Sequence, residues 1–256
     1  MIELNKCLSL MDLTSLNSTD TPKQIIALTQ KVNDFKKHFP NYSTPAAICV
    51  YPNFAADVKA NLKVKGVNIA VVAGVFPNSQ SYLEVKLLEC KMAIANGADE
   101  VDIVLALNKF LNEDLNSAAE EISKIKEAIG DKHLKVILET GALKTEEKIR
   151  AASFLAMKAG ADFIKTSTGK MEPAATPEAA RIMCECIKEY YEQTGKMIGF
   201  KPAGGMVTPE DAMCYYKIVE DILGEKWLNP HLFRLGASRL ANNILSNLEN
   251  KEIKYY

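Results

Sequence analysis

Two lysines that directly follow bulky apolar residues carry the strongest chemical signal in the sequence. Lys165 lies in the run 161–167 (ADFIKTS), and Lys201 lies in the run 198–205 (IGFKPAGG). Burial and a neighbouring ammonium both favour the neutral amine of a lysine. A neutral amine near pH 7 attacks carbonyl carbons and can form a Schiff base. The pair therefore predicts imine chemistry, although the residues alone do not choose between the two lysines.

Asp102 is the carboxylate that best fits this pair. The run 99–104 (DEVDIV) alternates, so Asp102 shares a strand face with Glu100 and not with Val101. A carboxylate that faces two lysines either neutralises them or relays protons between them and a substrate. The plainer alternative is that each lysine reaches solvent at a strand end, or pairs with Asp102 or Glu139.

The elements that must position these residues alternate along the whole chain. Short apolar runs with strand character cover 8–13, 47–51, 68–72, 100–105, 135–140, 163–166, 198–202 and 232–236. Segments with helical spacing cover 21–38, 81–96, 117–129, 145–159, 176–194 and 208–223, and each of the last three begins with a threonine at the expected N-cap.

Eight strand–helix units of about 30 residues predict a (β/α)8 TIM barrel, an α/β fold. We expect one domain over 1–256 with a short flexible C-terminal tail around 250–256. An open doubly wound sheet is disfavoured, because no glycine-rich dinucleotide turn follows the first run. In a barrel the functional side chains come from the carboxyl ends of the strands, which is where Asp102, Lys165 and Lys201 fall.

Glycine-containing loops follow the last three predicted strands. They hold Gly169 and Lys170, Gly204 and Gly205, and the run 236–238 (GAS). Backbone N–H groups, hydroxyls and a helix N-terminus at this end of a barrel commonly bind phosphate. The loops therefore predict a phosphate site beside the lysines, against the alternative that the glycines only form turns.

Composition excludes several other classes of protein. Of 256 residues 48% are hydrophobic and 25% are charged, and the formal net charge is −1. These values argue against a disordered or membrane-spanning chain and give no general attraction to nucleic acid or membranes. The three histidines are isolated, so no metal site is expected. Six widely spread cysteines fit reduced thiols, and we expect a cytoplasmic protein.

The chain resembles the deoxyribose-phosphate aldolases, a family of class I aldolases, over almost its whole length. The resemblance is carried by the runs 11–17 (MDLTSLN), 46–52 (AAICVYP), 97–102 (GADEVD), 165–170 (KTSTGK) and 199–205 (GFKPAGG). It implies that Lys165 is the Schiff-base lysine and that Lys201 lowers its pKa. It also implies that Asp102 works with Lys201 through water as the acid/base partner.

The resemblance further implies a substrate pocket. Its expected lining residues are Asp12, Thr14, Asn17, Cys49 and Thr168. Its expected phosphate-binding residues are Gly169, Lys170, Gly204, Gly205, Gly236 and Ser238. Many relatives have an arginine in the loop that reads GGMVT here (204–208), and this chain has Arg239 where they have serine. Our hypothesis is that Arg239 supplies the missing charge. Tyr256 fits the place of a C-terminal tyrosine that closes the site in some relatives.

The reaction that the resemblance implies is the reversible cleavage of 2-deoxy-D-ribose 5-phosphate to D-glyceraldehyde 3-phosphate and acetaldehyde. It needs no cofactor and no metal, and it suits deoxyribonucleotide catabolism in a monomer or homodimer. The partners are then a small-molecule sugar phosphate and acetaldehyde. Two alternatives stay open. One is another Schiff-base barrel, such as a transaldolase-like or keto-acid aldolase. The other is a non-catalytic sugar-phosphate-binding barrel whose lysines only neutralise phosphate.

Overall fold

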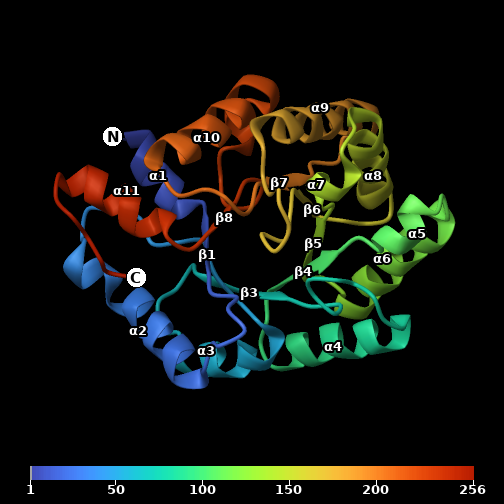
Figure 1. Cartoon of the computed structure of the whole chain (residues 1–256). Helices are drawn as coiled ribbons and strands as arrows, with labels where there is room; N and C mark the ends of the chain where they lie inside the picture. The colour runs from blue at the N-terminus through green and yellow to red at the C-terminus, as the bar shows by residue number, and fades with distance from the viewer. Residues whose placement is uncertain (1) are drawn as a thin grey trace.

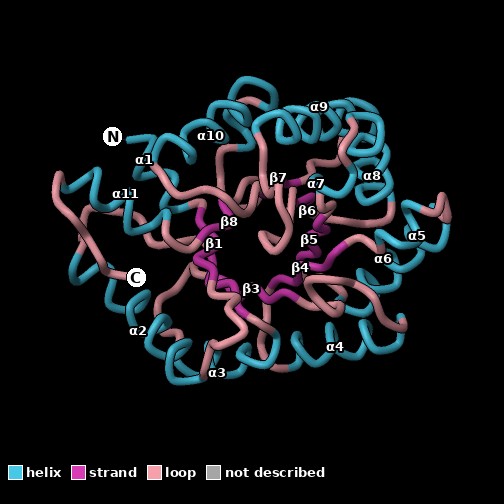
Figure 2. Tube along the Cα trace, viewed as in Figure 1, coloured by secondary structure: helices cyan, strands magenta, loops and turns pink. Residues whose placement is uncertain are grey.

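Eight short parallel strands form a ring at the centre of the computed structural model, which describes residues 2–256 (Figure 2). The strand order is β7-β6-β5-β4-β3-β2-β1-β8. Parallel bridges from Phe200 to Phe233 and from Ala203 to Gly236 join β7 to the β8 side and close the ring. The strands are β1 (Met11–Thr14), β2 (Ala47–Val50), β3 (Asn68–Val72), β4 (Glu100–Val104), β5 (His133–Ile137), β6 (Phe163–Lys165), β7 (Gly199–Lys201) and β8 (Leu235–Ala237).

Helices surround this ring on all sides (Figure 1). The α-helices are α1 (Ile2–Ser9), α2 (Pro22–His38), α3 (Ala55–Asn61), α4 (Leu83–Ala95), α5 (Leu107–Leu111), α6 (Leu115–Ile129), α7 (Thr140–Leu143), α8 (Glu146–Lys158), α9 (Pro177–Thr194), α10 (Pro209–Leu223) and α11 (Leu240–Glu249). Two short 3₁₀ helices are η1 (Pro52–Phe54) and η2 (Glu225–Trp227). The predicted (β/α)8 TIM barrel is therefore confirmed. No helix within residues 2–256 is long and apolar enough to cross a membrane.

The predicted helix starts at three threonines are also confirmed. The side chains of Thr145, Thr176 and Thr208 each accept a hydrogen bond from a backbone N–H in the first turn of the following helix. Such a cap satisfies a backbone donor that the helix itself leaves free. These caps begin α8, α9 and α10, the helices that follow β5, β6 and β7.

Three of the predicted strand boundaries were wrong. The first strand begins at Met11 and not at residue 8, because residues 8 and 9 belong to α1, which packs against α10 and α11. The fifth strand ends at Ile137, and Glu139 takes a left-handed conformation with a φ of 54° before α7. The last strand begins at Leu235, three residues later than expected.

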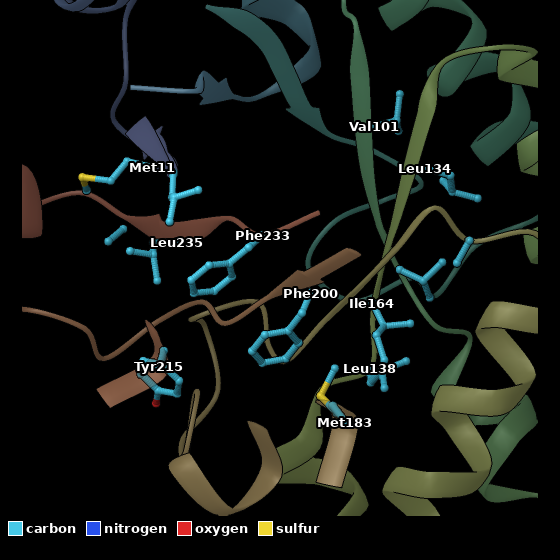
Figure 3. Close-up of a cluster of buried hydrophobic side chains, with 14 of the residues drawn as sticks. Met11, Val101, Leu134, Leu138, Ile164, Met183, Phe200, Tyr215, Phe233 and Leu235 are labelled. Atoms are coloured by element: carbon cyan, nitrogen blue, oxygen red, sulfur yellow. The ribbon is translucent and has the colours of Figure 1, made fainter. Parts of the chain in front are cut away.

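Outward-facing strand residues make the main hydrophobic core between the barrel and its helices. Figure 3 shows residues of this set, such as Ile164, Phe200 and Leu235, beside Met183 of α9 and Tyr215 of α10. Burial of each large apolar side chain stabilises the fold by about 1.5–3 kcal/mol. Because side chains alternate along a strand, the neighbours of these core residues point into the barrel.

The barrel interior has an apolar side and a charged side. Small apolar residues of β2 and β3 cluster on one side, and they are Ala47, Cys49, Ala70 and Val72. On the other side the ring of Phe163 lies 5.9 Å from both the Nζ of Lys135 and the Cζ of Arg234. Gly199 leaves room for this ring, because an added Cβ would lie 2.3 Å from a ring carbon of Phe163. Phe163 therefore packs directly against the charged groups of the interior.

Candidate active site

Seven ionisable side chains from five strands and one adjoining segment fill the charged side of the barrel. Three are carboxylates and four are cations, and each is at most 3% exposed. Their alternation with outward-facing core residues explains why all of them point inward. They are Asp12, Glu100, Asp102, Lys135, Lys165, Lys201 and Arg234.

Asp102 lies at the centre of this network. Its Oδ2 accepts hydrogen bonds from the Nζ atoms of Lys165 and Lys201, each at 2.8 Å. Its Oδ1 accepts one from the Nζ of Lys135 at 2.9 Å. Lys165 and Lys201 are also register partners on the adjacent strands β6 and β7. The structure thus brings together the three residues that sequence analysis singled out.

The four cations differ in how many carboxylates they contact. Lys201 binds Asp12 as well as Asp102. Lys135 lies 2.5 Å from Glu100, 2.9 Å from Asp102 and 3.7 Å from Asp12, so it contacts all three carboxylates.

Arg234 also contacts two carboxylates, Asp12 at 2.6 Å and Glu100 at 2.6 Å. Within residues 2–256, Lys165 forms an ion pair only with Asp102, through an oxygen that it shares with Lys201. Lys165 is therefore the cation with the fewest carboxylate partners.

This difference separates the pKa values of the two predicted lysines. Burial lowers the pKa of Lys165, and the charge of Lys201 lowers it further, against the opposing effect of Asp102. Burial also acts on Lys201, but Asp102 and Asp12 outweigh it and hold the pKa of Lys201 above its ordinary value. Of the two lysines, only Lys165 therefore has a pKa shifted toward the neutral amine. Lys165 is thus the better candidate for an amine that attacks a carbonyl.

The carboxylates of the network stay ionised. Burial alone would raise the pKa of Asp102, but Lys135, Lys165 and Lys201 outweigh burial and hold it well below the usual range. The pKa of Glu100 falls to about 2, because Lys135 and Arg234 outweigh burial. No group of three or more His, Cys, Asp or Glu side chains within the described residues is arranged to hold a metal ion.

Sequence analysis missed Lys135 and Arg234. Lys135 lies between Leu134 and Val136, and Arg234 lies next to Leu235. A charged residue between apolar neighbours on a buried strand was the available signal, and it is the same signal that identified Lys165. Glu139 was considered as a partner of the lysines, and this interpretation was wrong.

Glu139 instead anchors the loop after β6. Its carboxylate accepts a hydrogen bond from the backbone N–H of Thr168 at 3.1 Å and one from the hydroxyl of Thr168 at 2.6 Å. The same hydroxyl accepts a hydrogen bond from the backbone N–H of Lys170 at 3.0 Å. Thr168 therefore links the loop that carries Gly169 and Lys170 to the wall of the barrel.

A cavity of about 250 Å³ opens above Lys165. Its lining includes most of the residues expected from the sequence, which are Thr14, Asn17, Lys165, Thr168, Gly169, Lys170, Gly204, Gly205, Gly236, Ser238 and Arg239. Asp12, Asp102 and Lys201 lie buried outside this lining. Cys49 is also buried, and burial raises the pKa of its thiol.

The rim of the cavity has the features of an anion site. Gly204, with a φ of +83°, approaches the loop after β6 so closely that an added Cβ would lie 2.9 Å from the Cα of Gly169. Ser238 and Arg239 directly precede α11, whose N-terminus carries free backbone N–H groups. The ammonium of Lys170, which here donates to the carbonyl of Leu16 at 2.5 Å, also lines the cavity.

Tyr256 lies outside the cavity lining, in contacts with α2 and α11. Its ring stacks on that of Phe35 at 5.8 Å, and its backbone N–H donates to the side chain of Asn242 at 2.9 Å. Its hydroxyl is buried and finds no hydrogen-bond partner among residues 2–256. The role of Tyr256 as a lid and the flexibility of the tail stay predictions.

Comparisons with known proteins agree with this geometry. The family model described as DeoC/LacD family aldolase matches residues 6–220. A Caenorhabditis elegans protein provisionally named deoxyribose-phosphate aldolase is 45% identical over 249 residues, which cover 96% of this chain and 82% of that protein.

Two solved structures extend the comparison. A provisionally named deoxyribose-phosphate aldolase from Coccidioides immitis is 27% identical, with a TM-score of 0.79 over 96% of this chain and 87% of the other. The tetrameric deoxyribose phosphate aldolase from Aeropyrum pernix is 22% identical and shares the fold, with a TM-score of 0.75 over 98% of this chain and 94% of the other. Because the family model covers most of the sequence and the nematode relative aligns along nearly all of it, this chain belongs to the DeoC/LacD family of aldolases and is a lyase.

Proposed function

We propose that this aldolase reversibly cleaves 2-deoxy-D-ribose 5-phosphate to D-glyceraldehyde 3-phosphate and acetaldehyde through a Schiff base on Lys165. The observation that carries the proposal is the position of Lys165. It is the least compensated cation of a buried network, and it lines a cavity whose rim is suited to an anion. A nucleophilic amine and an anion site in one cavity match an aldehyde that carries a phosphate.

The first step is attack of the neutral Lys165 amine on the C1 aldehyde of the open-chain sugar. Loss of water from the resulting carbinolamine gives a protonated imine, which withdraws electrons from C2. The C3 hydroxyl then gives up its proton, and the C2–C3 bond breaks. The bonding electron pair moves toward the imine as an enamine, and C3 leaves as the aldehyde carbon of glyceraldehyde 3-phosphate. This chemistry requires no metal or organic cofactor.

Asp102 and Lys201 supply the proton transfers in this proposal. The Asp102 carboxylate is ionised and touches both lysines, so it can accept the released proton through water and return it to C2 of the enamine. Lys201 stays charged between Asp12 and Asp102, which keeps a proton donor beside the reacting carbons. Hydrolysis of the new imine then frees acetaldehyde and restores the Lys165 amine.

The phosphate binds at the rim, away from the bond that breaks. The loops that carry Gly169 and Gly205, together with the N-terminus of α11, offer backbone N–H donors, and Lys170 and Arg239 offer positive charge. Binding of a remote group positions the reacting carbons over Lys165. A sugar that lacks the phosphate should therefore lose turnover as well as affinity.

The test is to incubate the protein with acetaldehyde, reduce it with borohydride and map the modified lysine by mass spectrometry. We expect a reduced two-carbon adduct on Lys165 and none in the Lys165→Met variant. An adduct on Lys201 would reverse the two roles. No adduct on folded protein would favour a non-catalytic sugar-phosphate-binding barrel, and cleavage of a keto acid or a transaldolase donor in place of deoxyribose phosphate would favour another Schiff-base aldolase.

A further inference from the structure

Arg234 is a buried cation that lies outside the lining of the substrate cavity. It precedes β8, is 1% exposed and points into the barrel. Its Nη1 donates to Asp12 at 2.6 Å and to Glu100 at 3.0 Å, and its Nη2 donates to Glu100 at 2.6 Å. Its Nε donates to the carbonyl of Pro230. A guanidinium does not lose its proton in proteins, so this charge is permanent.

The network holds one more positive charge than it has negative charges. If every group ionises, Lys135, Lys165, Lys201 and Arg234 give four positive charges, and Asp12, Glu100 and Asp102 give three negative ones. Excess charge in a buried site is costly, and the usual relief is loss or gain of a proton. Loss of the proton from Lys165 brings the total to zero, because three cations then face three carboxylates.

The other groups that face the network do not change this total near neutral pH. Burial raises the pKa of the Cys49 thiol on β2, so it stays neutral. Burial lowers the pKa of His133 on β5, whose Nδ1 lies 3.9 Å from Glu100, so the imidazole is mainly neutral at pH 7. From β3, Asn68 contributes only an uncharged donor to Glu100 at 2.7 Å.

We propose that Arg234 is a positioning residue for the aldolase reaction: its permanent charge gives the network its one excess cation, and this excess keeps Lys165 as the free amine. The inference rests on the proposed function, in which Lys165 is the nucleophile. Arg234 itself lies outside the cavity lining, so it acts through the charge balance of Asp12 and Glu100.

Charge balance predicts opposite effects for two substitutions. Arg234→Met leaves three cations and three carboxylates, so Lys165 retains its proton. Loss of a buried charge changes the free-amine fraction by about tenfold to a hundredfold. The rate of borohydride trapping of acetaldehyde on Lys165 at pH 7 should fall by that factor and recover as the pH is raised. Glu100→Gln instead adds to the positive excess and should move the acid limb of the trapping rate to lower pH.

The Glu100→Gln/Arg234→Met double variant shows whether the change in trapping comes from the lost charge or from the lost packing. It holds three cations, Lys135, Lys165 and Lys201, against the carboxylates of Asp12 and Asp102, so the excess of one positive charge returns. We expect its pH profile of trapping to move back toward that of the unmodified protein, although two buried groups have been changed. Arg234→Lys keeps the charge and should also keep the profile near the original.

Circular dichroism and thermal unfolding establish that each variant is folded before it is compared. A folded Arg234→Met variant with an unchanged pH profile would overturn the proposal, and so would a double variant that traps no faster than Arg234→Met. If Arg234→Met does not fold, the direction of the Glu100→Gln shift decides, and a shift to higher pH refutes the charge argument. Failure of the unmodified protein to trap acetaldehyde on Lys165 would instead refute the proposed function.

Discussion

Replacing Thr168 by valine should weaken phosphate binding without changing imine formation. The hydroxyl of Thr168 donates to the buried carboxylate of Glu139 at 2.6 Å and accepts from the backbone N–H of Lys170 at 3.0 Å. Valine has nearly the same shape but lacks the hydroxyl, so both bonds are lost. Of the two hydrogen bonds between residue 168 and Glu139, only the one from the backbone N–H then remains.

The structure sets the size of the effect. A hydrogen bond to a charged group contributes about 1.5–3 kcal/mol to stability. For a protein of this size that corresponds to a fall in Tm of about 3–12 °C. If substrate binding must supply about 1.4 kcal/mol of this free energy to order the loop, the KM for the phosphorylated sugar rises about tenfold.

The assay compares two readouts in one set of variants. We expect the KM for deoxyribose 5-phosphate to rise in Thr168→Val, while borohydride trapping of acetaldehyde on Lys165 keeps its rate. Thr168→Ser keeps the hydroxyl and should restore KM. Thr194→Val is a control at the far end of α9, because its hydroxyl also donates one hydrogen bond, to the carbonyl of Tyr190 at 2.7 Å, and accepts one from a backbone N–H, that of Lys196 at 3.2 Å. An unchanged KM, or an equal loss of trapping, would refute the role given to this loop.

Three further predictions follow from the site. Arg239→Ala should raise the KM for the phosphorylated sugar and leave acetaldehyde trapping unchanged; an unchanged KM would show that Arg239 does not replace the missing loop arginine. Asp12, Glu100 and Asp102 have depressed pKa values, so the stability they contribute is present above about pH 4–5 and is lost as the pH falls toward the folded-state values. Urea unfolding at pH 7, 4 and 3 should show this decline, and a constant free energy of unfolding down to pH 3 would contradict it. Tyr256→Phe removes a buried hydroxyl that has no partner, so it should raise stability by about 1 kcal/mol in the same assay, and a clear loss of stability would show that the hydroxyl is bonded in solution.

The barrel was predictable because each of its signals is local. Alternation along 99–104 placed Glu100 and Asp102 on one face, and their shared contact with Lys135 confirms that arrangement. The threonine caps were equally local, because each depends on four consecutive residues. The helix at 2–9 was not predictable in the same way, since its apolar residues gain their partners from α10 and α11, more than 200 residues later.

Residue types and spacing alone could not show which of Lys165 and Lys201 has the lowered pKa. Both follow an aromatic or aliphatic residue at the end of a short strand, and both bind the same oxygen of Asp102. The difference comes from Asp12 on β1, which reaches Lys201 but makes no ion pair with Lys165 among the described residues. Only closure of the barrel, which places β8 between β1 and β7, creates that difference.

The network is better explained by chemistry than by stability. Buried ion pairs often stabilise a fold less than well-packed apolar residues of similar volume would. The β2 and β3 side of the same interior is filled with small apolar residues, so the barrel can be packed without charges. The seven charged groups on the other side are therefore not required for packing, and we explain them by the reaction. If that reasoning holds, substitutions at Arg234 should change the pH dependence of imine formation, whereas substitutions at Thr168 should weaken phosphate binding and leave that pH dependence unchanged.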